Sequence, residues 1–252
     1  MNKEIRQENL QTPADLKWQV TATKQGSVLE FMPGDLAFLG SASSSSQIKC
    51  HWAGRWAAWQ RQKLARFSQP LSKAAALKSN RARVIWDLTC GLGYDSLWFL
   101  FCGQKVIAFE RHPAMAALVK ANLQAAALNP PPWEKRGGSF ALIENNFLKL
   151  LPLELAQLPH PDVLYLDPMF GEEGEQRKSL PKKNLQLLPQ VVGLDPDAPQ
   201  LLAAALAWAK ANQVGRVILK RAVRTPSIIK PDWEIKARQV RFEGWSTGPK
   251  LD

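Results

Sequence analysis

The chain of 252 residues lacks the features of a membrane or secreted protein. No apolar run approaches the roughly 20 residues that a helix needs to cross a bilayer. The first residues, Met1–Trp18, are polar and mixed in charge, without the apolar stretch of a secretory signal. Three cysteines (Cys50, Cys90 and Cys102) show no metal-ligand spacing and suit free thiols in a reducing compartment. We therefore expect a cytoplasmic protein without a membrane segment.

Metal ligands and acidic residues are also scarce. The three histidines, His51, His112 and His160, lack ligand spacing, so we expect no metal site. No Asp or Glu occurs between Leu36 and Trp86, where Lys and Arg are frequent, and the net charge is +11. Clustered positive charge is typical of proteins that bind a polyanion. We therefore expect a nucleic acid as partner, the alternative being a basic surface that only keeps the protein in solution.

Residues 1–80 are predicted to form a small N-terminal α+β extension. Short strands and turns come first, with a hairpin signal at Pro33–Gly34. Trp52, Trp56 and Trp59 then share one face of a predicted helix. We favour packing of this face on the core, although tryptophans interleaved with arginines can also stack on nucleic-acid bases.

From residue 81 to residue 252 the pattern alternates between strands and helices. The predicted strands are 83–89, 105–111, 140–146, 161–168 and 216–222, and the predicted helices are 95–103, 113–128 and 198–212. Glu234–Phe242 is expected to add one more strand, for which an antiparallel direction is open. Such alternation indicates an α/β fold with a doubly wound, mostly parallel sheet.

Ligands bind such a sheet beyond the carboxyl ends of its strands, and four of these ends carry candidate site residues. They are Asp87 to Asp95 after the first strand, Glu110–Arg111 after the second, Asn145–Asn146 after the third and Asp167 to Phe170 after the fourth. Gly91 and Gly93 permit a tight turn through which the backbone can approach a ligand closely. A carboxylate at Glu110 can accept hydrogen bonds from both hydroxyls of a ribose.

The glycine turn departs from the fingerprint of dinucleotide-binding proteins. Counting from Gly91, the third glycine position holds Ser96, and the carboxylate of Asp95 near the helix start would repel a pyrophosphate. The glycine turn, the acidic end of the second strand and the Asp-Pro-x-Phe sequence together resemble the pattern of S-adenosylmethionine (SAM) methyltransferases. An NAD-binding oxidoreductase is therefore disfavoured, whereas an ordinary βα turn remains the alternative for the glycines taken alone.

The sequence Asp167-Pro168-Met169-Phe170 resembles the (Asp/Asn)-Pro-Pro-(Tyr/Phe) motif of enzymes that methylate exocyclic amino groups of bases. Asp167 and the carbonyl of Pro168 are expected to accept hydrogen bonds from the target amine and to orient its lone pair. Phe170 is expected to stack on a base that has left its helix. The motif alone leaves guanine, adenine and a protein amide open as targets.

Longer segments show a closer resemblance, which spans residues 28–250. The segments DLTCGLGYDSLWFLFCG, FERHPAMAALV, LYLDPMF, RKSLPKKNLQLL and FEGWSTGP occur in the order of the RsmJ family, the bacterial SAM-dependent guanine-N2 methyltransferases of small-subunit ribosomal RNA. The resemblance implies a Rossmann-like class I SAM methyltransferase domain over 81–252, with SAM as cofactor. It also implies N2 of a guanine in 16S ribosomal RNA as the target, the small ribosomal subunit as partner, and we expect a monomer.

Together with the SAM pattern, the resemblance implies a set of cofactor-binding residues: Asp87, Gly91, Gly93, Tyr94, Asp95, Glu110, Arg111, Asn146, Phe147 and Asp167. Asp167, Pro168 and Phe170 are the expected catalytic residues. Basic residues after the fourth and fifth strands are expected to hold RNA phosphates: Arg177, Lys178, Lys182, Lys183, Lys220 and Arg221. Gly171 replaces a proline of the family, so a protein that binds SAM and RNA without turnover stays open, as does methylation of another base.

Overall fold

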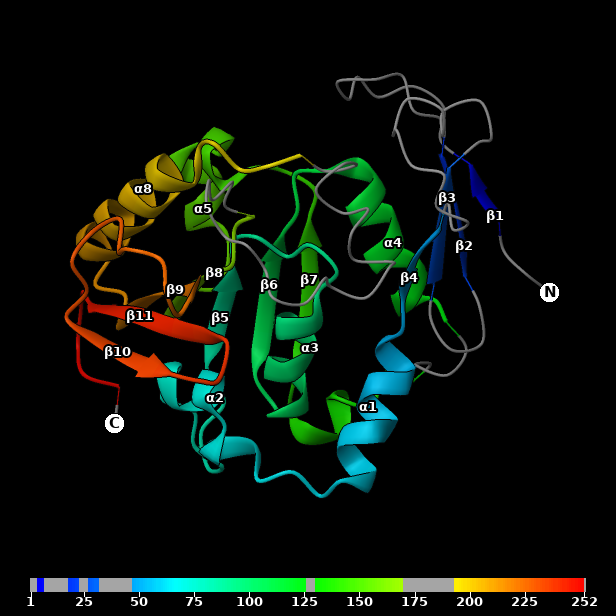
Figure 1. Cartoon of the computed structure of the whole chain (residues 1–252), viewed down its shortest axis with the longest axis horizontal. Helices are drawn as coiled ribbons and strands as arrows, with labels where there is room; N and C mark the ends of the chain where they lie inside the picture. Colours follow the sequence, from blue (N-terminus) through cyan, green and yellow to red (C-terminus); the bar gives the residue numbers. More distant parts are fainter. Residues whose placement is uncertain are drawn as a thin grey trace. The chain divides into compact units, whose positions relative to one another are not determined.

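The computed structural model describes residues 4–6, 18–22, 27–31, 47–125, 130–169 and 193–251 (Figure 1). The chain divides into two compact units, each with its own sheet. The described parts of residues 1–62, 112–131 and 169–194 form the first unit, and those of 63–111, 132–168 and 195–252 form the second. This division differs from the expected boundary at residue 80, because residues 63–80 group with the second unit and 112–131 with the first.

The first unit contains an antiparallel sheet in the order β1-β2-β3-β4. Its elements are β1 (Glu4–Arg6), β2 (Trp18–Ala22), β3 (Ser27–Phe31), β4 (Gln47–Cys50), α1 (Trp52–Arg61) and α4 (Pro113–Leu123). Helix α4 contacts β2, β3 and β4, and the hydroxyl of Ser27 donates to the carbonyl of Leu118 at 2.7 Å. Trp52 and Trp56 are buried, which confirms that these two side chains of α1 pack inside the fold. The predicted hairpin at Pro33–Gly34 lies outside the described residues.

The second unit contains a seven-stranded sheet in the order β10-β11-β9-β8-β5-β6-β7. The strands are β5 (Val84–Asp87), β6 (Lys105–Phe109), β7 (Ser139–Ile143), β8 (Val163–Leu166), β9 (Arg216–Ala222), β10 (Trp233–Lys236) and β11 (Val240–Ser246). Strands β5 to β9 pair in parallel, while β11 runs antiparallel to β9 and to β10. The predicted doubly wound, mostly parallel sheet is therefore confirmed.

Helices of the second unit connect and cover these strands. They are η2 (Arg66–Ser68), α2 (Pro70–Ala74), α3 (Tyr94–Phe101), η4 (Glu134–Arg136), η5 (Phe147–Lys149), α5 (Pro152–Ala156) and α8 (Ala198–Ala211). Helix α3 lies between β5 and β6 in the chain, and α8 between β8 and β9, and these strand pairs step along the sheet in opposite directions. Right-handed crossovers therefore place the two helices on opposite faces. All four residues of β8 are buried, as is typical of a parallel strand with both faces covered.

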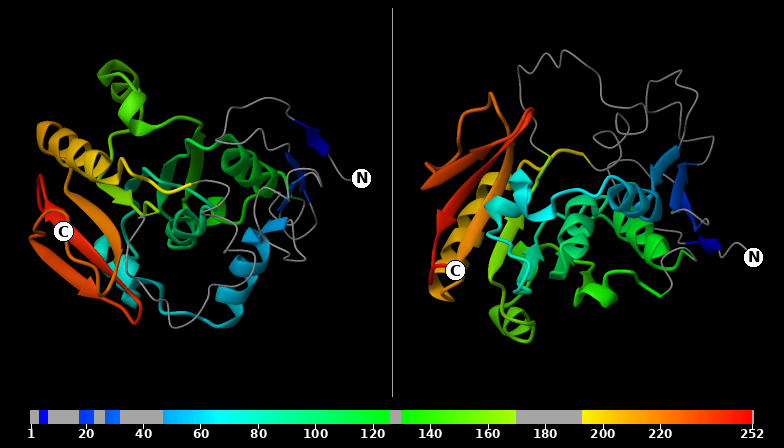
Figure 2. Two further views of the ribbon diagram at one scale, coloured as in Figure 1. Left: turned by 45° about the horizontal axis from the view of Figure 1, so that its top comes forward. Right: turned by 90° about the horizontal axis from the view of Figure 1, so that it is seen from below.

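The prediction of one strand over Glu234–Phe242 is wrong, because the chain reverses within that segment. Strands β10 and β11 form an antiparallel hairpin, closed by a hydrogen bond from the amide of Ala237 to the carbonyl of Val240 at 2.8 Å. The turn contains no glycine, proline or asparagine, so the usual turn signals were missing from the sequence. The hairpin forms the edge of the sheet beside β9 (Figure 2).

Candidate functional site

The turn between β5 and α3 has the conformation that its glycines predict. Gly91 and Gly93 adopt positive φ angles of 54° and 66°, in the left-handed region that favours glycine. Apart from its two chain neighbours, no heavy atom of the described residues lies within 4 Å of the place where a Cβ of Gly91 would be, so one side of this part of the turn is open. The amide of Gly91 donates to Oε2 of Glu110 at 2.6 Å, which ties the turn to the end of β6.

Asp87 lies behind this turn and is only 1% exposed. Its Oδ2 accepts a hydrogen bond from the hydroxyl of Ser96 at 2.6 Å, and its Oδ1 accepts one from the amide of Thr89 at 3.2 Å. Burial raises the pKa of Asp87 from 3.8 to about 7, and the nearby charges of Asp95 and Asp167 contribute to the rise. Asp87 therefore holds the start of α3 and the turn together from inside the fold.

Glu110 and Arg111 follow β6 and face different partners. Glu110 is buried beneath the glycine turn, as described above. Arg111 donates to both carboxylate oxygens of Asp197, at 2.9 and 2.7 Å, and forms an ion pair with Asp195. Arg111 therefore links the end of β6 to the residues just before α8. Glu110 is the better placed of the two for a ligand in the turn.

Asn146 and Phe147 lie where η5 begins, after β7. The Oδ1 of Asn146 accepts a hydrogen bond from the amide of Leu148 at 3.0 Å, so its side chain caps this short helix. The ring of Phe147 is buried and packs edge-on against Phe109 and Trp208, with centroids 6.0 and 6.3 Å apart. Phe147 therefore serves the core, and cofactor contact by its side chain stays a prediction.

A cluster of charged and hydroxyl groups lies at the ends of β8 and β9, and is called here the Lys220 cluster. The Nζ of Lys220 is 2.7 Å from Oδ2 of Asp95 and 2.7 Å from Oδ2 of Asp167. The hydroxyl of Tyr165 also donates to Oδ2 of Asp95, at 2.6 Å. The cluster consists of Asp95, Tyr165, Asp167 and Lys220, and it brings two predicted cofactor residues into contact with a predicted RNA-binding residue.

The acid–base properties of the Lys220 cluster follow from its surroundings. Burial raises the pKa of Tyr165, and the nearby aspartates add to the rise, so its hydroxyl stays protonated as a donor. Burial alone lowers the pKa of Lys220, but the attraction of Asp95 and Asp167 outweighs it and keeps the pKa above its ordinary value. Burial and the charge of Asp95 raise the pKa of Asp167, against the opposing attraction of Lys220.

Of the described residues in the predicted catalytic motif, Asp167 has a partly exposed side chain. Its side chain is 39% exposed, whereas Pro168 is buried, and Phe170 lies outside the described residues. The amide of Asp167 donates to Oγ1 of Thr89 at 2.6 Å, which joins the end of β8 to the glycine-turn segment. Among the residues that the structure describes, Oδ1 of Asp167 accepts no hydrogen bond, so this oxygen is available to a ligand.

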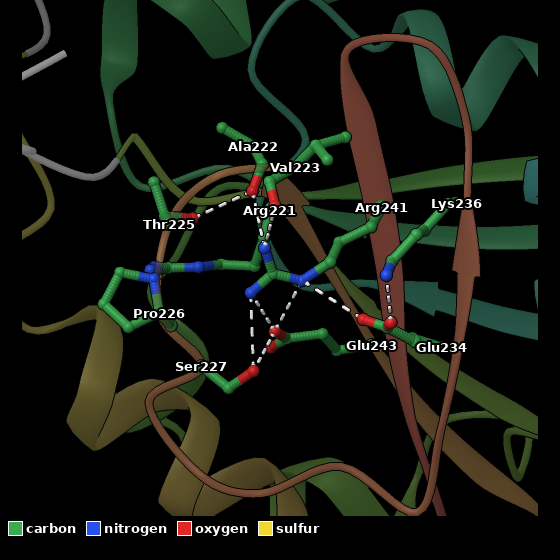
Figure 3. Close-up of polar contacts among 10 residues, drawn as sticks. All are labelled: Arg221, Ala222, Val223, Thr225, Pro226, Ser227, Glu234, Lys236, Arg241 and Glu243. Atoms are coloured by element: carbon green, nitrogen blue, oxygen red, sulfur yellow. Dashed lines mark hydrogen bonds and ion pairs between the residues drawn. The ribbon is translucent and has the colours of Figure 1, made fainter.

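Arg221 follows Lys220 in β9 but belongs to a different set of contacts, drawn in Figure 3. It is 6% exposed, and its guanidinium donates to the carbonyl of Pro226 at 2.8 Å. Beside it, Arg241 of β11 donates from Nε to Oε1 of Glu243 at 2.9 Å and from Nη1 to the carbonyls of Ala222 and Val223, each at 2.8 Å. Burial of Arg221 argues against the predicted phosphate contact, because a buried guanidinium has to leave its packing to reach RNA.

The other predicted RNA-binding residues are Arg177, Lys178, Lys182 and Lys183, and all four lie outside the described residues. Three residues of the site were missed by the sequence prediction: Thr89, Tyr165 and Ser96. Tyr165 lies in β8, two residues before the predicted Asp167, and side chains two residues apart share a face of an extended segment. That spacing was the available signal for Tyr165. Thr89 lies in the turn after β5, which ends at Asp87, so strand alternation gave no signal for it. The contact of Ser96 with Asp87 carried no comparable signal.

Some broader features of the described residues bear on ligands and location. No helix in this part of the chain is long and apolar enough to cross a membrane. The same residues contain no group of three or more His, Cys, Asp or Glu side chains that could hold a metal ion. The three cysteines are buried free thiols.

The residues at the strand ends fit a cationic nucleoside cofactor. The glycine turn offers an open side, Glu110 is a buried carboxylate directly beneath it, and the Lys220 cluster holds two carboxylates against one ammonium. Within these described groups the negative charges outnumber the positive ones, which favours a ligand that carries positive charge. A carboxylate beneath the turn suits ribose hydroxyls, as the sequence predicts for Glu110.

Comparison with known proteins agrees with this geometry. Residues 14–246 match the family model SAM_MT, whose members are described as SAM-dependent methyltransferases. A protein of Buchnera aphidicola named ribosomal RNA small subunit methyltransferase J is 37% identical over 69% of this chain and 66% of its own length. A protein of Thioalkalivibrio sulfidiphilus with the same name is 34% identical over 72% of this chain and 69% of its own length.

Among solved structures, the fold is similar to that of a SAM-dependent methyltransferase from Neisseria gonorrhoeae. The two share 22% identity with a TM-score of 0.59, over 89% of this chain and 84% of that one. At this level of identity the match supports the fold alone.

Proposed function

Because this chain belongs to the ribosomal RNA small subunit methyltransferase J family of SAM-dependent methyltransferases, we propose that it methylates N2 of a guanine in 16S ribosomal RNA. The proposed site lies at the carboxyl ends of β5, β6, β8 and β9. The proposed substrate is an assembled or partly assembled small ribosomal subunit, on which the protein acts as a cytoplasmic monomer.

The single observation that carries this proposal is the position of Asp167. Its carboxylate follows β8 directly, its Oδ2 is held by Lys220, and its side chain is open to solvent. Its backbone amide is hydrogen-bonded to the segment that precedes the glycine turn. A carboxylate fixed beside a cofactor turn is the acceptor that methylation of an exocyclic amine requires.

The guanine amine is a poor nucleophile, since its lone pair is delocalised into the ring. SAM, when bound, supplies a methyl group on a positively charged sulfur, so no further activation of that group is needed. In our proposal Oδ1 of Asp167 accepts a hydrogen bond from the amine, which turns the lone pair toward the methyl group. The same oxygen takes the proton that the methylated nitrogen releases. Glu110 holds the ribose, and the backbone at Gly91 approaches the cofactor.

RNA binding is proposed for the basic segment after the catalytic motif, namely Arg177, Lys178, Lys182 and Lys183. These four residues follow Asp167 closely in the sequence, within 16 positions of it. Arg224, which is exposed in the loop after β9, extends this set. Each contact with a phosphate would release counterions and make the affinity depend on salt.

The proposal is tested with purified protein, SAM labelled in its methyl group, and small ribosomal subunits from cells that lack the family enzyme. After digestion of the RNA we expect the label in N2-methylguanosine. Label in N6-methyladenosine would instead assign another base. Binding of SAM without any labelled nucleoside would favour a SAM-binding RNA-binding protein without turnover.

The matched control is the Asp167→Ala variant, assayed with the same subunits. It should bind SAM in the calorimeter and leave the RNA unlabelled. Labelling at the wild-type rate by this variant would contradict the role of Asp167 while leaving the reaction itself established.

A further inference from the structure

Lys220 was expected at the RNA interface, yet its ammonium group lies between two carboxylates of the site. Its distances to Oδ2 of Asp95 and Oδ2 of Asp167 are both 2.7 Å, and its side chain is only 22% exposed. A lysine that holds RNA phosphates needs its ammonium group at the surface. The contacts of Lys220 therefore require a different explanation.

The main chain of Lys220 is fixed on both sides by the sheet. Within β9, Lys220 pairs with Phe242 of β11, and the preceding Leu219 pairs with Leu166 at the end of β8. Asp167 immediately follows Leu166, and its own amide is hydrogen-bonded to Thr89. Lys220 is thus held within β9, and Asp167 is held directly after β8 by its own amide hydrogen bond, so the ion pair sets the direction of the Asp167 carboxylate.

The ion pair also leaves the two oxygens of Asp167 in different situations. Lys220 holds Oδ2, whereas Oδ1 accepts no hydrogen bond among the described residues and the side chain is 39% exposed. An anchored oxygen on one side and an open oxygen on the other is the arrangement that a directed hydrogen-bond acceptor needs.

Among the described residues, the charged and polar groups that influence Asp167 come from several elements, and Lys220 is the cation in contact with it. Asp95 of α3 and Asp195 before α8 raise its pKa, and the neutral hydroxyl of Tyr165 belongs to the same cluster. Asp87 of β5 lies near the same cluster, and burial raises its pKa to about 7. Lys220 is the cation of the Lys220 cluster. Without its ammonium group, repulsion between the carboxylates would raise their pKa values, and one of them would bind a proton.

We infer that Lys220 is a positioning residue for Asp167: it anchors Oδ2, keeps the carboxylate ionised, and so leaves Oδ1 ready to accept the target amine. The inference rests on the proposed function. It assigns Lys220 a role within the site in place of a contact with RNA phosphate.

The first test measures Asp167 directly and needs no turnover. The carboxyl carbons of aspartate are labelled with ¹³C, the Asp167 signal is assigned by its loss in Asp167→Asn, and the protein is titrated without SAM or RNA. The pKa of Asp167 should be higher in Lys220→Met than in the wild type, and Lys220→Arg should restore most of the difference. An Asp167 pKa that is the same in Lys220→Met and in the wild type overturns the inference.

Lys220→Met leaves two carboxylates without their counter-ion, so the same comparison is also made in an Asp95→Asn background. There the variant removes one negative and one positive charge together, and the fold is expected to tolerate it. Lys220→Met should again raise the pKa of Asp167, relative to Asp95→Asn alone. No rise in this background overturns the inference even where the single variant does not fold.

The second test uses the methyl-transfer reaction at saturating SAM and RNA. Lys220→Met should lower kcat by about 100-fold at pH 7, as for loss of a general base. In a plot of kcat against pH, the fall in rate on the acidic side should begin at a higher pH in Lys220→Met than in the wild type. Lys220→Arg should recover part of the rate. Lys230→Met, which removes an exposed lysine from the loop after β9, is the matched control and should keep the wild-type kcat and pH profile.

A weaker affinity for RNA with an unchanged kcat in Lys220→Met would assign the lysine to the RNA interface and overturn the inference. Failure of the proposed function is distinguishable, because the wild-type protein would then label no guanosine while the carboxyl titration still gives its answer.

Discussion

Two ion-pair clusters lie at neighbouring positions of the same sheet, and they differ in charge balance. In one, Arg241 pairs with Glu243 deep in the fold, with side-chain exposures of 5% and 0%. In the Lys220 cluster, one ammonium group serves two carboxylates, and Asp167 stays open to solvent. A balanced, buried pair holds strands and a loop together. A cluster with surplus negative charge at the surface is equipped to receive a cationic ligand.

The contacts of the two cations sharpen this difference. Besides Glu243, Arg241 donates to the carbonyls of Ala222 and Val223, so it fixes the backbone where β9 ends (Figure 3). The contacts of Lys220 described here are with carboxylates from α3 and from the end of β8. The Arg241–Glu243 pair therefore keeps the end of β9 in place, close in sequence to Lys220. Loss of the Arg241–Glu243 pair should lower the stability of the fold, whereas loss of a contact in the Lys220 cluster should lower the rate of methyl transfer.

The largest effect is expected from Asp167→Ala. Removal of the open carboxylate should lower kcat by about 10²- to 10⁴-fold, because the variant loses the acceptor for the amine proton. Its thermal unfolding temperature should stay within a few degrees of the wild type, since the side chain is partly exposed. Single-turnover methylation and calorimetry measure the two properties separately. A large loss of stability would place Asp167 with the structural ion pairs.

Arg241→Met should have the opposite profile. Removal of one partner leaves the buried carboxylate of Glu243 without its counter-ion, which should lower the free energy of unfolding by about 3–5 kcal/mol. Urea denaturation followed by circular dichroism measures this change. The folded fraction should keep its kcat at saturating substrates. Lys236→Ala, which breaks the exposed pair with Glu234, is the control and should leave the free energy of unfolding nearly unchanged.

Asp87 should make stability depend on pH in the direction opposite to an ordinary ion-paired carboxylate. Its pKa is raised from 3.8 to about 7 in the folded protein, so the native state binds its proton more tightly than the unfolded chain does. Stability from this group is complete below about pH 4 and is lost as the pH rises to about 7, by about 4 kcal/mol in all. Asp87→Asn should remove this slope from unfolding curves recorded across that range. An unchanged slope would contradict the raised pKa.

The smallest effect concerns RNA binding. Replacement of Lys182 and Lys183 by alanine should reduce the affinity for RNA and lower the slope of log K against log salt by about 2 units. Filter binding at several salt concentrations measures both. Methylation at saturating RNA should be unaffected, which separates these lysines from Lys220. An unaltered salt slope would remove them from the proposed interface.

Much of the site followed from local sequence. The glycine turn, Glu110 and Asp167 lie at ends of strands that the hydrophobic pattern located within a few residues, and parallel strands bring such ends to one edge. The roles of Asn146, Phe147 and Arg111 were harder to predict. Asn146 caps η5 through the amide of Leu148, a local contact that its position after β7 did not indicate. Phe147 packs on Phe109 and Arg111 pairs with Asp197, and both contacts depend on residues far along the chain.

The sequence by itself determined the alternation of strands and helices from β5 to β9, the positive-φ glycines, and the carboxylates that follow β6 and β8. Those features depend on residue type and on contacts close along the chain. Only the tertiary structure decided what Lys220 does, because its partners are 125 and 53 residues away in the sequence. The crossover that sets β9 beside β8 brings the ammonium group of Lys220 between two aspartates. Electrostatic attraction depends on the distance between the charges in the folded protein and not on their separation in the sequence.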